Sequence, residues 1–141
     1  MTKRSPAKLL VGNSFPLPLV RQAVSIRPWS VRQLRARLAR HPVASYWGHA
    51  NTRSAAESLL GVSLAPATDR PALALSPDRL PCLDGETFIS CYVLSPDYRP
   101  GFRPAIGSEV SAEDIRSWKL LRIDWLPPKR NKTNPRNERT R

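Results

Sequence analysis

The amino-acid sequence predicts an α/β fold: a single domain with a mixed sheet of five or six strands, flanked by about three helices. The chain has 141 residues, of which 40% are hydrophobic, and this suffices for one compact core but not for two. Short apolar runs typical of strands alternate along the chain with segments of helical periodicity. Residues 1–8 and 127–141 are basic and lack such patterns, so we expect disordered ends around a domain at residues 9–126.

The sequence of the first part of the domain predicts three strands and one helix. An apolar run at residues 9–12 predicts a buried strand, and a moderately alternating run at 23–27 predicts a second one. Ser30 is a suitable N-cap for a helix over residues 31–40, whose apolar positions share one side while arginines occupy the rest. A proline ends this helix, and residues 43–47 predict a third strand.

The helix that follows has clear signals at both ends. Asn51 or Thr52 can cap its start, apolar residues recur at helical spacing, and Gly61 suits the position just after its end. Beyond it, residues 62–81 are rich in proline and alanine and contain one plausible strand, at residues 71–75.

The last part of the domain predicts a tight turn, two strands and a helix. Asp84-Gly85 is a strong turn signal, and the strongest strand pattern of the chain follows at residues 87–94. Residues 95–104 combine prolines, aromatics and arginines, which suits either a loop that covers a substrate or contacts another subunit, or an ordinary surface loop. A helix-start signature predicts a helix over residues 111–118, and alternation predicts a final strand at 120–125.

Composition restricts the class of protein. No run of about 18 apolar residues occurs, so we expect no membrane span, and the N-terminus lacks the apolar core of a secretory signal. Cys82 and Cys91 follow no disulfide or zinc-site spacing, and we interpret them as reduced, small buried side chains of a cytoplasmic protein. The sequence contains no dinucleotide-binding, P-loop, zinc-peptidase or hydrolase-nucleophile motif, so we expect neither a metal nor a cofactor.

The net charge of +12 points to a polyanionic partner such as nucleic acid or a nucleotide. The two ends supply most of it, because residues 1–8 add three positive charges and residues 127–141 add a net five. Residues 9–126 therefore carry a net charge of only +4. The basic tail is a candidate nucleic-acid contact, whereas the domain itself is mildly basic.

The candidate catalytic residue is His49, one of only two histidines in the chain. It follows Gly48 at the predicted start of a helix, where unpaired backbone N–H groups and the positive end of the helix dipole favour a phosphate. Its imidazole can move a proton near neutral pH, and Thr52 can add a hydroxyl to the phosphate cradle. An RNA substrate can supply its own 2′-hydroxyl as nucleophile, which removes the need for a metal. The alternative for His49 is a purely structural role at the helix start.

Further motifs accompany His49. Gly48, His49 and Thr52 form a Gly-His-x-x-Thr turn, residues 59–62 read Leu-Leu-Gly-Val, and an arginine follows as Asp69-Arg70; upstream, residues 10–15 read Leu-Val-Gly-Asn-Ser-Phe. This order resembles a family of small proteins from archaeal viruses, bacteria and mobile elements. The family includes the viral anti-CRISPR ring nucleases that act against type III systems, and the similarity extends over most of residues 9–126.

The resemblance implies an α/β homodimer whose symmetric pocket binds cyclic tetra-adenylate, a second messenger of type III CRISPR defence, and cleaves it without metal. It implies His49 as general acid or base, with ligand contacts from Asn13, Ser14, Gly48, Thr52 and Arg70. Tyr98-Arg99-Pro100-Gly101 lies where the family has Arg-x-Pro-Glu-Gly, which adds Arg99 as a contact. The family's glutamate is missing here and Pro16 replaces a polar residue, so binding without cleavage stays open.

Together these observations predict a metal-independent ring nuclease that binds and cleaves a cyclic oligoadenylate. The main alternative is a non-catalytic accessory protein of a mobile element that binds nucleic acid or a cyclic nucleotide. A third is a protein whose partner is another protein. The structural alternatives at single positions are strand-end capping for Asn13 and Ser14, and a surface arginine for Arg70.

Overall fold

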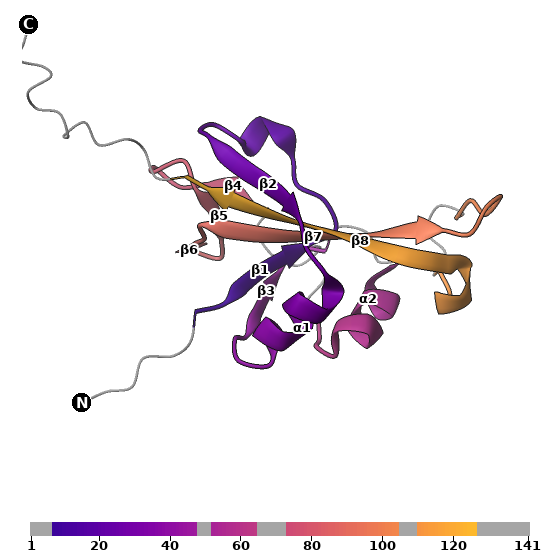
Figure 1. Cartoon of the computed structure of the whole chain (residues 1–141). Coiled ribbons are helices and arrows are strands. Elements are labelled where there is room, and N and C mark those ends of the chain that lie inside the picture. Colours follow the sequence, from indigo (N-terminus) through magenta and orange to yellow (C-terminus); the bar gives the residue numbers. More distant parts are fainter. Residues whose placement is uncertain (1–6, 48–51, 65–72, 105–109, 127–141) are drawn as a thin grey trace, which may run out of the picture.

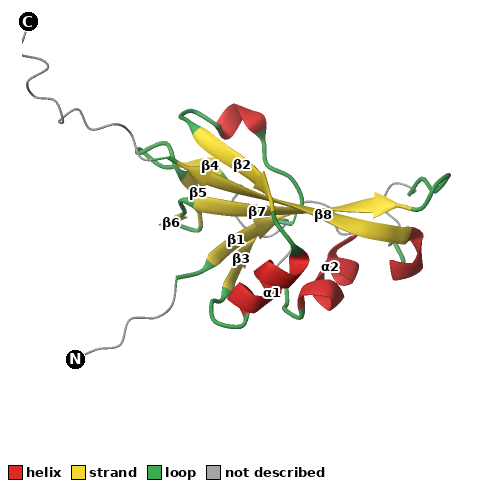
Figure 2. Ribbon diagram, in the orientation of Figure 1, coloured by secondary structure: helices red, strands yellow, loops and turns green. Residues whose placement is uncertain are grey.

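The computed structural model describes residues 7–47, 52–64, 73–104 and 110–126. Its main sheet consists of β1 (Leu9–Gly12), β2 (Val24–Pro28), β3 (Val43–Ser45), β7 (Ser90–Tyr98) and β8 (Ile115–Trp125). The strand order is β2-β8-β7-β1-β3 (Figures 1 and 2). β1 pairs in parallel with both β3 and β7, whereas β8 pairs antiparallel with β7 and β2. The predicted mixed sheet is therefore confirmed.

Different elements cover the two faces of this sheet. They are the helices α1 (Val31–Leu38) and α2 (Arg53–Leu60), and a second sheet of β4 (Ala74–Leu75), β5 (Pro81–Leu83) and β6 (Glu86–Thr87). Leu9 and Val11 of β1 belong to the buried cluster that includes both helices, while Leu10 belongs to the cluster that includes Leu83 of β5. Successive strand residues point to opposite faces, so the helices and the second sheet lie on opposite sides. The chain forms one small α/β domain.

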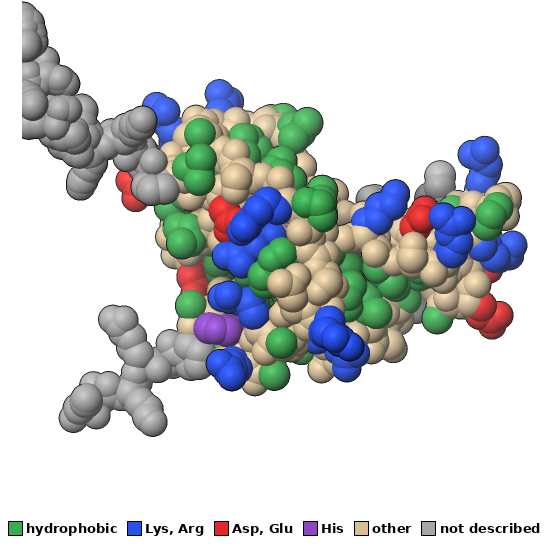
Figure 3. Space-filling model, viewed as in Figure 1, with side chains coloured by type: hydrophobic (Ala, Val, Ile, Leu, Met, Phe, Trp, Pro, Cys, Tyr) green, Lys and Arg blue, Asp and Glu red, His purple; other side chains and the backbone are tan. Residues whose placement is uncertain are grey.

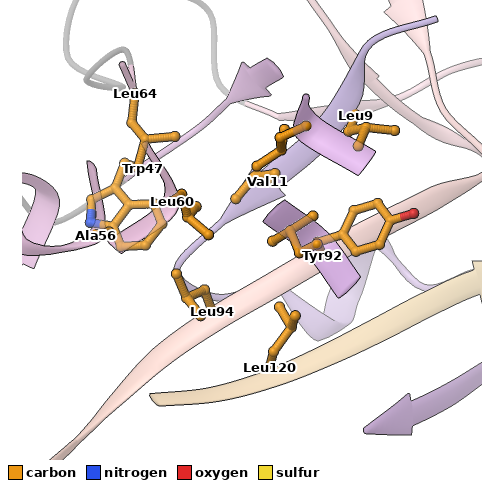
Figure 4. Packing of buried hydrophobic residues seen from close by; sticks show 11 residues of the cluster. Leu9, Val11, Trp47, Ala56, Leu60, Leu64, Tyr92, Leu94 and Leu120 are labelled. Carbon is orange, nitrogen blue, oxygen red and sulfur yellow. The ribbon is translucent and has the colours of Figure 1, made fainter. Parts of the chain in front are cut away.

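The core on the helix side packs around Trp47, which is 1% exposed. Figure 4 shows its indole beside Ala56 and Leu60 of α2, with Val11 and Leu94 contributed by the two parallel strands. All four residues of β1 are buried, which explains why this strand reads as a continuous apolar run rather than an alternating one.

Several local sequence signals act as predicted. Ser30 caps α1 reciprocally: its Oγ accepts from the Gln33 N–H at 3.0 Å, and its own N–H donates to the Gln33 Oε1 at 3.1 Å. Gly61 ends α2 with a left-handed φ of 75°. Asp84 and Gly85 join β5 to β6 with φ values of 53° and 80°, the pair of positive φ angles that a type I′ turn requires.

The prediction of a helix over residues 111–118 is wrong. Ser111 accepts a hydrogen bond from the Glu113 N–H at 3.2 Å but starts only a short 3₁₀ turn, η4 (Ala112–Asp114), after which β8 begins. β8 pairs with β7 along its whole length, and these ladder hydrogen bonds override the local helix signal. The described part of the chain thus has two α-helices rather than three, with a second 3₁₀ turn, η1, at Leu17–Leu19.

The strand predicted at residues 87–94 also differs. Thr87 belongs to β6, whereas β7 continues to Tyr98 through the first residues of the predicted loop 95–104. β1 pairs with β7 only as far as Val93, so beyond it β7 and β8 form a two-stranded arm that leaves the rest of the sheet (Figure 1). Within the described ranges no strand pairs with the other side of β7 in this arm, which is the setting in which a strand accommodates Pro96.

The remaining predictions fall partly outside the described residues. Of the strand predicted at 71–75, the described part contains β4. The basic segments 1–6 and 127–141 lie outside the described residues. No helix among those described is long and apolar enough to cross a membrane.

Candidate functional site

The structure describes four of the seven predicted site residues. Gly48, His49 and Arg70 lie outside the described residues, and Asn13, Ser14, Thr52 and Arg99 lie inside them. The geometry of the candidate site is therefore built from the residues that flank Gly48 and His49.

Asn13 and Ser14 lie at the carboxyl end of β1, beside the end of β3. These two strands are parallel, so their carboxyl ends meet at one edge of the sheet, the edge at which α/β proteins commonly bind ligands. The pairing extends past β3, because the Tyr46 N–H donates to the Val11 carbonyl at 3.2 Å. Asn13 is half-buried and Ser14 is exposed. The structure thus places both residues next to the Tyr46-Trp47 segment that leads into Gly48.

Trp47 and Thr52 hold the two ends of the segment that contains His49. The Trp47 Nε1–H donates to the Thr52 Oγ1 at 3.1 Å, and both side chains are buried. Thr52 occupies the N-cap position of α2 but makes no side-chain cap hydrogen bond, because its oxygen accepts from the indole instead. This bond joins the residue before Gly48 to the N-cap residue of α2. The observed partner of the Thr52 hydroxyl is thus Trp47.

Tyr46 packs against Gly12 on the other face of the same edge. A Cβ on Gly12 would meet the Tyr46 ring in steric overlap, so only glycine allows this close approach. The Tyr46 hydroxyl lies 3.0 Å from the Cys91 Sγ, and both groups are buried. The packing of Tyr46 against Gly12 was not predicted from the sequence. The available signal was a glycine as the last residue of an otherwise apolar strand.

Neither Tyr46 nor Cys91 can act as a base or nucleophile at neutral pH. Burial raises the pKa of the Cys91 thiol to about 12, although the Tyr46 hydrogen bond opposes this shift. Burial, together with the neighbouring Cys91, raises the pKa of Tyr46 above its ordinary value. Cys82 and Cys91 are both free; Cys91 is buried as predicted, whereas Cys82 is only half-buried, contrary to the prediction. The Tyr46–Cys91 pair is a neutral packing contact.

Arg99 lies at the far end of the arm, away from Asn13 and Ser14. Its Nε donates to the Asp114 Oδ1 at 2.9 Å, and its guanidinium carbon lies 5.1 Å from the centre of the Phe102 ring. Gly12 is level with Val93 in the sheet, and the six residues from Val93 to Arg99 span about 20 Å of strand. Within one chain the structure therefore does not bring Arg99 to the carboxyl end of β1.

Neither a metal site nor a known relative adds to this geometry. Among the described residues, no three His, Cys, Asp or Glu side chains come together in a way that could hold a metal ion. The chain matches no protein-family model and no curated protein. The functional interpretation consequently depends on the residues of this chain alone.

Proposed function

We propose that this protein is a metal-independent ring nuclease that binds and cleaves a cyclic oligoadenylate, cyclic tetra-adenylate in the first place, as a cytoplasmic homodimer. The observation that supports the proposal best is the buried Trp47–Thr52 hydrogen bond. It anchors both ends of the segment containing His49, at the sheet edge where Asn13 and Ser14 lie. A catalytic group needs such anchoring, because small misplacements of reacting groups cost large factors in rate.

The proposed reaction is an internal transesterification. A ribose 2′-oxygen of the ring attacks the adjacent phosphorus and loses its proton, and the 5′-oxygen leaves and gains one. The products are a linear oligoadenylate with a 2′,3′-cyclic phosphate and a free 5′-hydroxyl. His49 moves a proton to or from one of these oxygens, while Asn13, Ser14, Gly48, Thr52 and Arg70 contact the ligand. Arg99 enters this scheme only as a contribution from the partner subunit, since its own arm carries it away from Gly12.

The test is cleavage of cyclic tetra-adenylate in the presence of EDTA. We expect the wild-type protein to produce linear oligoadenylates, and the H49A variant to lose about 10²–10⁴-fold in rate, the usual contribution of a general acid or base. His41 provides the matched control, because it is the other histidine and its Nδ1 lies 2.8 Å from the Ala7 carbonyl at the opposite end of β1. The H41A variant should keep wild-type activity. Absence of cleavage by the wild type, or equal rates for H49A and wild type, would refute the enzymatic proposal.

A second candidate function is binding of nucleic acid. Arg32, Arg35 and Arg40 of the α1 region are exposed, and none of them forms an ion pair with another described residue. Removing residues 127–141 and measuring RNA binding at several salt concentrations tests this function, since phosphate contacts give a linear fall of log affinity with log salt. Affinity that does not change with salt or truncation would exclude it.

A further inference from the structure

A pocket of about 290 Å³ lies at the amino ends of β1 and β7, the opposite end of β1 from Asn13. Three of its ten lining residues are cationic and none is acidic. Its lining consists of Lys8, Arg37 and Arg122, the hydroxyl residues Thr87, Ser90 and Tyr92, and the apolar residues Ala7, Leu9, Phe88 and Ile89. Figure 3 shows Lys and Arg side chains gathered on the face of the molecule that α1 covers. A pocket of this composition favours an anion.

Arg122 is fixed in place at one wall of the pocket. Its guanidinium carbon lies 4.9 Å from the centre of the Trp29 ring and 5.5 Å from the centre of the Tyr92 ring. Its Nε donates to the Asp124 Oδ1 at 2.9 Å. A guanidinium that contacts two neighbouring rings and a carboxylate has restricted rotamer freedom, so it can bind an anion with little further ordering.

Arg37 approaches the same pocket from α1. Its Nε is buried and has no hydrogen-bond partner among the described residues. Burial raises the pKa of the Tyr92 hydroxyl, and the positive charges of Arg122 and Arg37 oppose this shift, so both guanidinium groups act on the hydroxyl from nearby. The part of the Arg37 side chain that lines the pocket adds a positive charge that favours an anion.

The carboxylate beside the pocket is already fully engaged. Asp124 accepts from the Ser90 Oγ at 2.6 Å, from the Arg122 Nε at 2.9 Å and from the Arg27 Nη2 at 3.0 Å. It therefore balances Arg27 and Arg122 together, and these two carry one charge more than it does. Arg37 adds a further positive charge, with no acidic residue in the lining to neutralise it.

We propose that this pocket binds the phosphoryl group of a small phosphate ester. A phosphoryl group offers three acceptor oxygens, which matches the cationic donors Lys8, Arg37 and Arg122 that line the pocket from three different parts of the chain. The apolar side chains of Phe88, Leu9 and Ile89 then contact the organic part of the ester. This site is separate from the carboxyl end of β1 and does not depend on the ring-nuclease proposal.

The experiment measures binding to the full-length protein by calorimetry at low salt. The ligands are adenosine 5′-monophosphate, inorganic phosphate, and adenosine as the uncharged control. In the R37Q variant we expect at least a tenfold loss of affinity for the monophosphate, as for removal of one charge-assisted hydrogen bond. R35Q is the matched control, because Arg35 is exposed two residues earlier on α1 and does not line the pocket. A near-ultraviolet circular dichroism spectrum confirms that each variant is folded.

The outcomes separate the possible ligands. Monophosphate binding that exceeds phosphate binding by tenfold or more, together with the loss in R37Q, supports an ester, whereas equal affinities assign the site to free phosphate. Either result supports a phosphoryl site if adenosine does not bind. Lack of binding by both anions overturns the proposal, as does an equal loss in R37Q and R35Q.

Discussion

The two ends of β1 are built in opposite ways. At the carboxyl end, Tyr46, Trp47 and Thr52 are each less than 10% exposed and make contacts between neutral groups. At the amino end, Lys8 and Arg37 are cationic and only partly buried or exposed, around an open pocket. Packing stabilises the carboxyl end, whereas the amino end carries positively charged side chains that packing does not require.

This difference determines how substitutions at each end are interpreted. Removing a buried group at the carboxyl end changes the free energy of unfolding, so an effect on cleavage there must be separated from an effect on folding. Removing an exposed charge at the amino end changes stability little, so an effect on binding there can be read directly. Single substitutions at both ends of β1 test this contrast.

The largest effect is expected from G12A. The new methyl group overlaps the Tyr46 ring, and the ring cannot move freely because its hydroxyl contacts Cys91 in the core. Such overpacking should lower the free energy of unfolding by about 1–3 kcal/mol, measured by urea denaturation. In a Y46A background the space is open, so the same substitution should cost much less. Equal costs in both backgrounds would show that Tyr46 is not what restricts Gly12.

A somewhat smaller effect is expected from T52V. Valine has nearly the shape of threonine but leaves the Trp47 Nε1–H buried without its acceptor, which should cost about 1–2 kcal/mol. T87V is the control, because Thr87 is exposed and its substitution should change stability by less than about 0.5 kcal/mol. If T52V were as stable as the wild type, the bond would not anchor the segment containing His49.

The sequence predicted those parts of the fold that depend on neighbouring residues. Ser30, Gly61 and Asp84-Gly85 each act within one turn of the chain, and each has the predicted role. The prediction of a helix at 111–118 failed because β8 is defined by pairing with β7, whose partner residues lie 17 (Tyr98 to Ile115) to 34 (Ser90 to Asp124) positions away in the sequence. Ser111 still caps a turn, but strand pairing determines the structure of the residues after that turn.

In the candidate sites too, the features that depend on neighbouring residues were predicted, and those that depend on how distant elements meet were not. Asn13 and Ser14 directly follow β1, as the apolar run at residues 9–12 predicts, whereas their position beside the Tyr46-Trp47 segment results from the parallel pairing of β1 and β3. The Gly12–Tyr46 contact depends on the register of β1 against β3, which no local signal specifies. The Trp47–Thr52 bond is an exception, since it joins residues only five positions apart and yet was not predicted from the sequence. The arginines of α1 have the sequence pattern of a solvated face. That Arg37 meets Arg122 in one pocket depends on how the helix packs on the sheet.

Lowering the pH should reduce the folding stability that Asp124 provides near the amino end of β1. Burial alone would raise the pKa of this carboxyl group, but hydrogen bonds from Ser90, Arg122 and Arg27 outweigh burial and hold the pKa below its ordinary value. In the unfolded chain an aspartate has a pKa of about 3.9, so the stabilisation is complete above that pH and is lost as pH falls through the folded-state pKa.

The measurement is the urea midpoint at pH 6 and at pH 3. The wild type should lose more stability between these two values than D124N, which has no charge to lose. D78N serves as control, because Asp78 lies in an exposed turn and should leave the pH dependence as in the wild type. A D124N variant with the full wild-type decline would show that another group is responsible.

The smallest effect is expected from K8Q. The Lys8 Nζ lies 3.5 Å from the Glu86 Oε1, and both side chains are nearly half exposed, so the pair should contribute less than about 0.5 kcal/mol to stability. Salt should reduce even this difference, since exposed ion pairs are screened. The same variant should bind adenosine 5′-monophosphate more weakly, because Lys8 lines the phosphoryl pocket. A loss of stability above about 1 kcal/mol would mean that the Lys8–Glu86 pair supports the fold, contrary to what its exposure predicts.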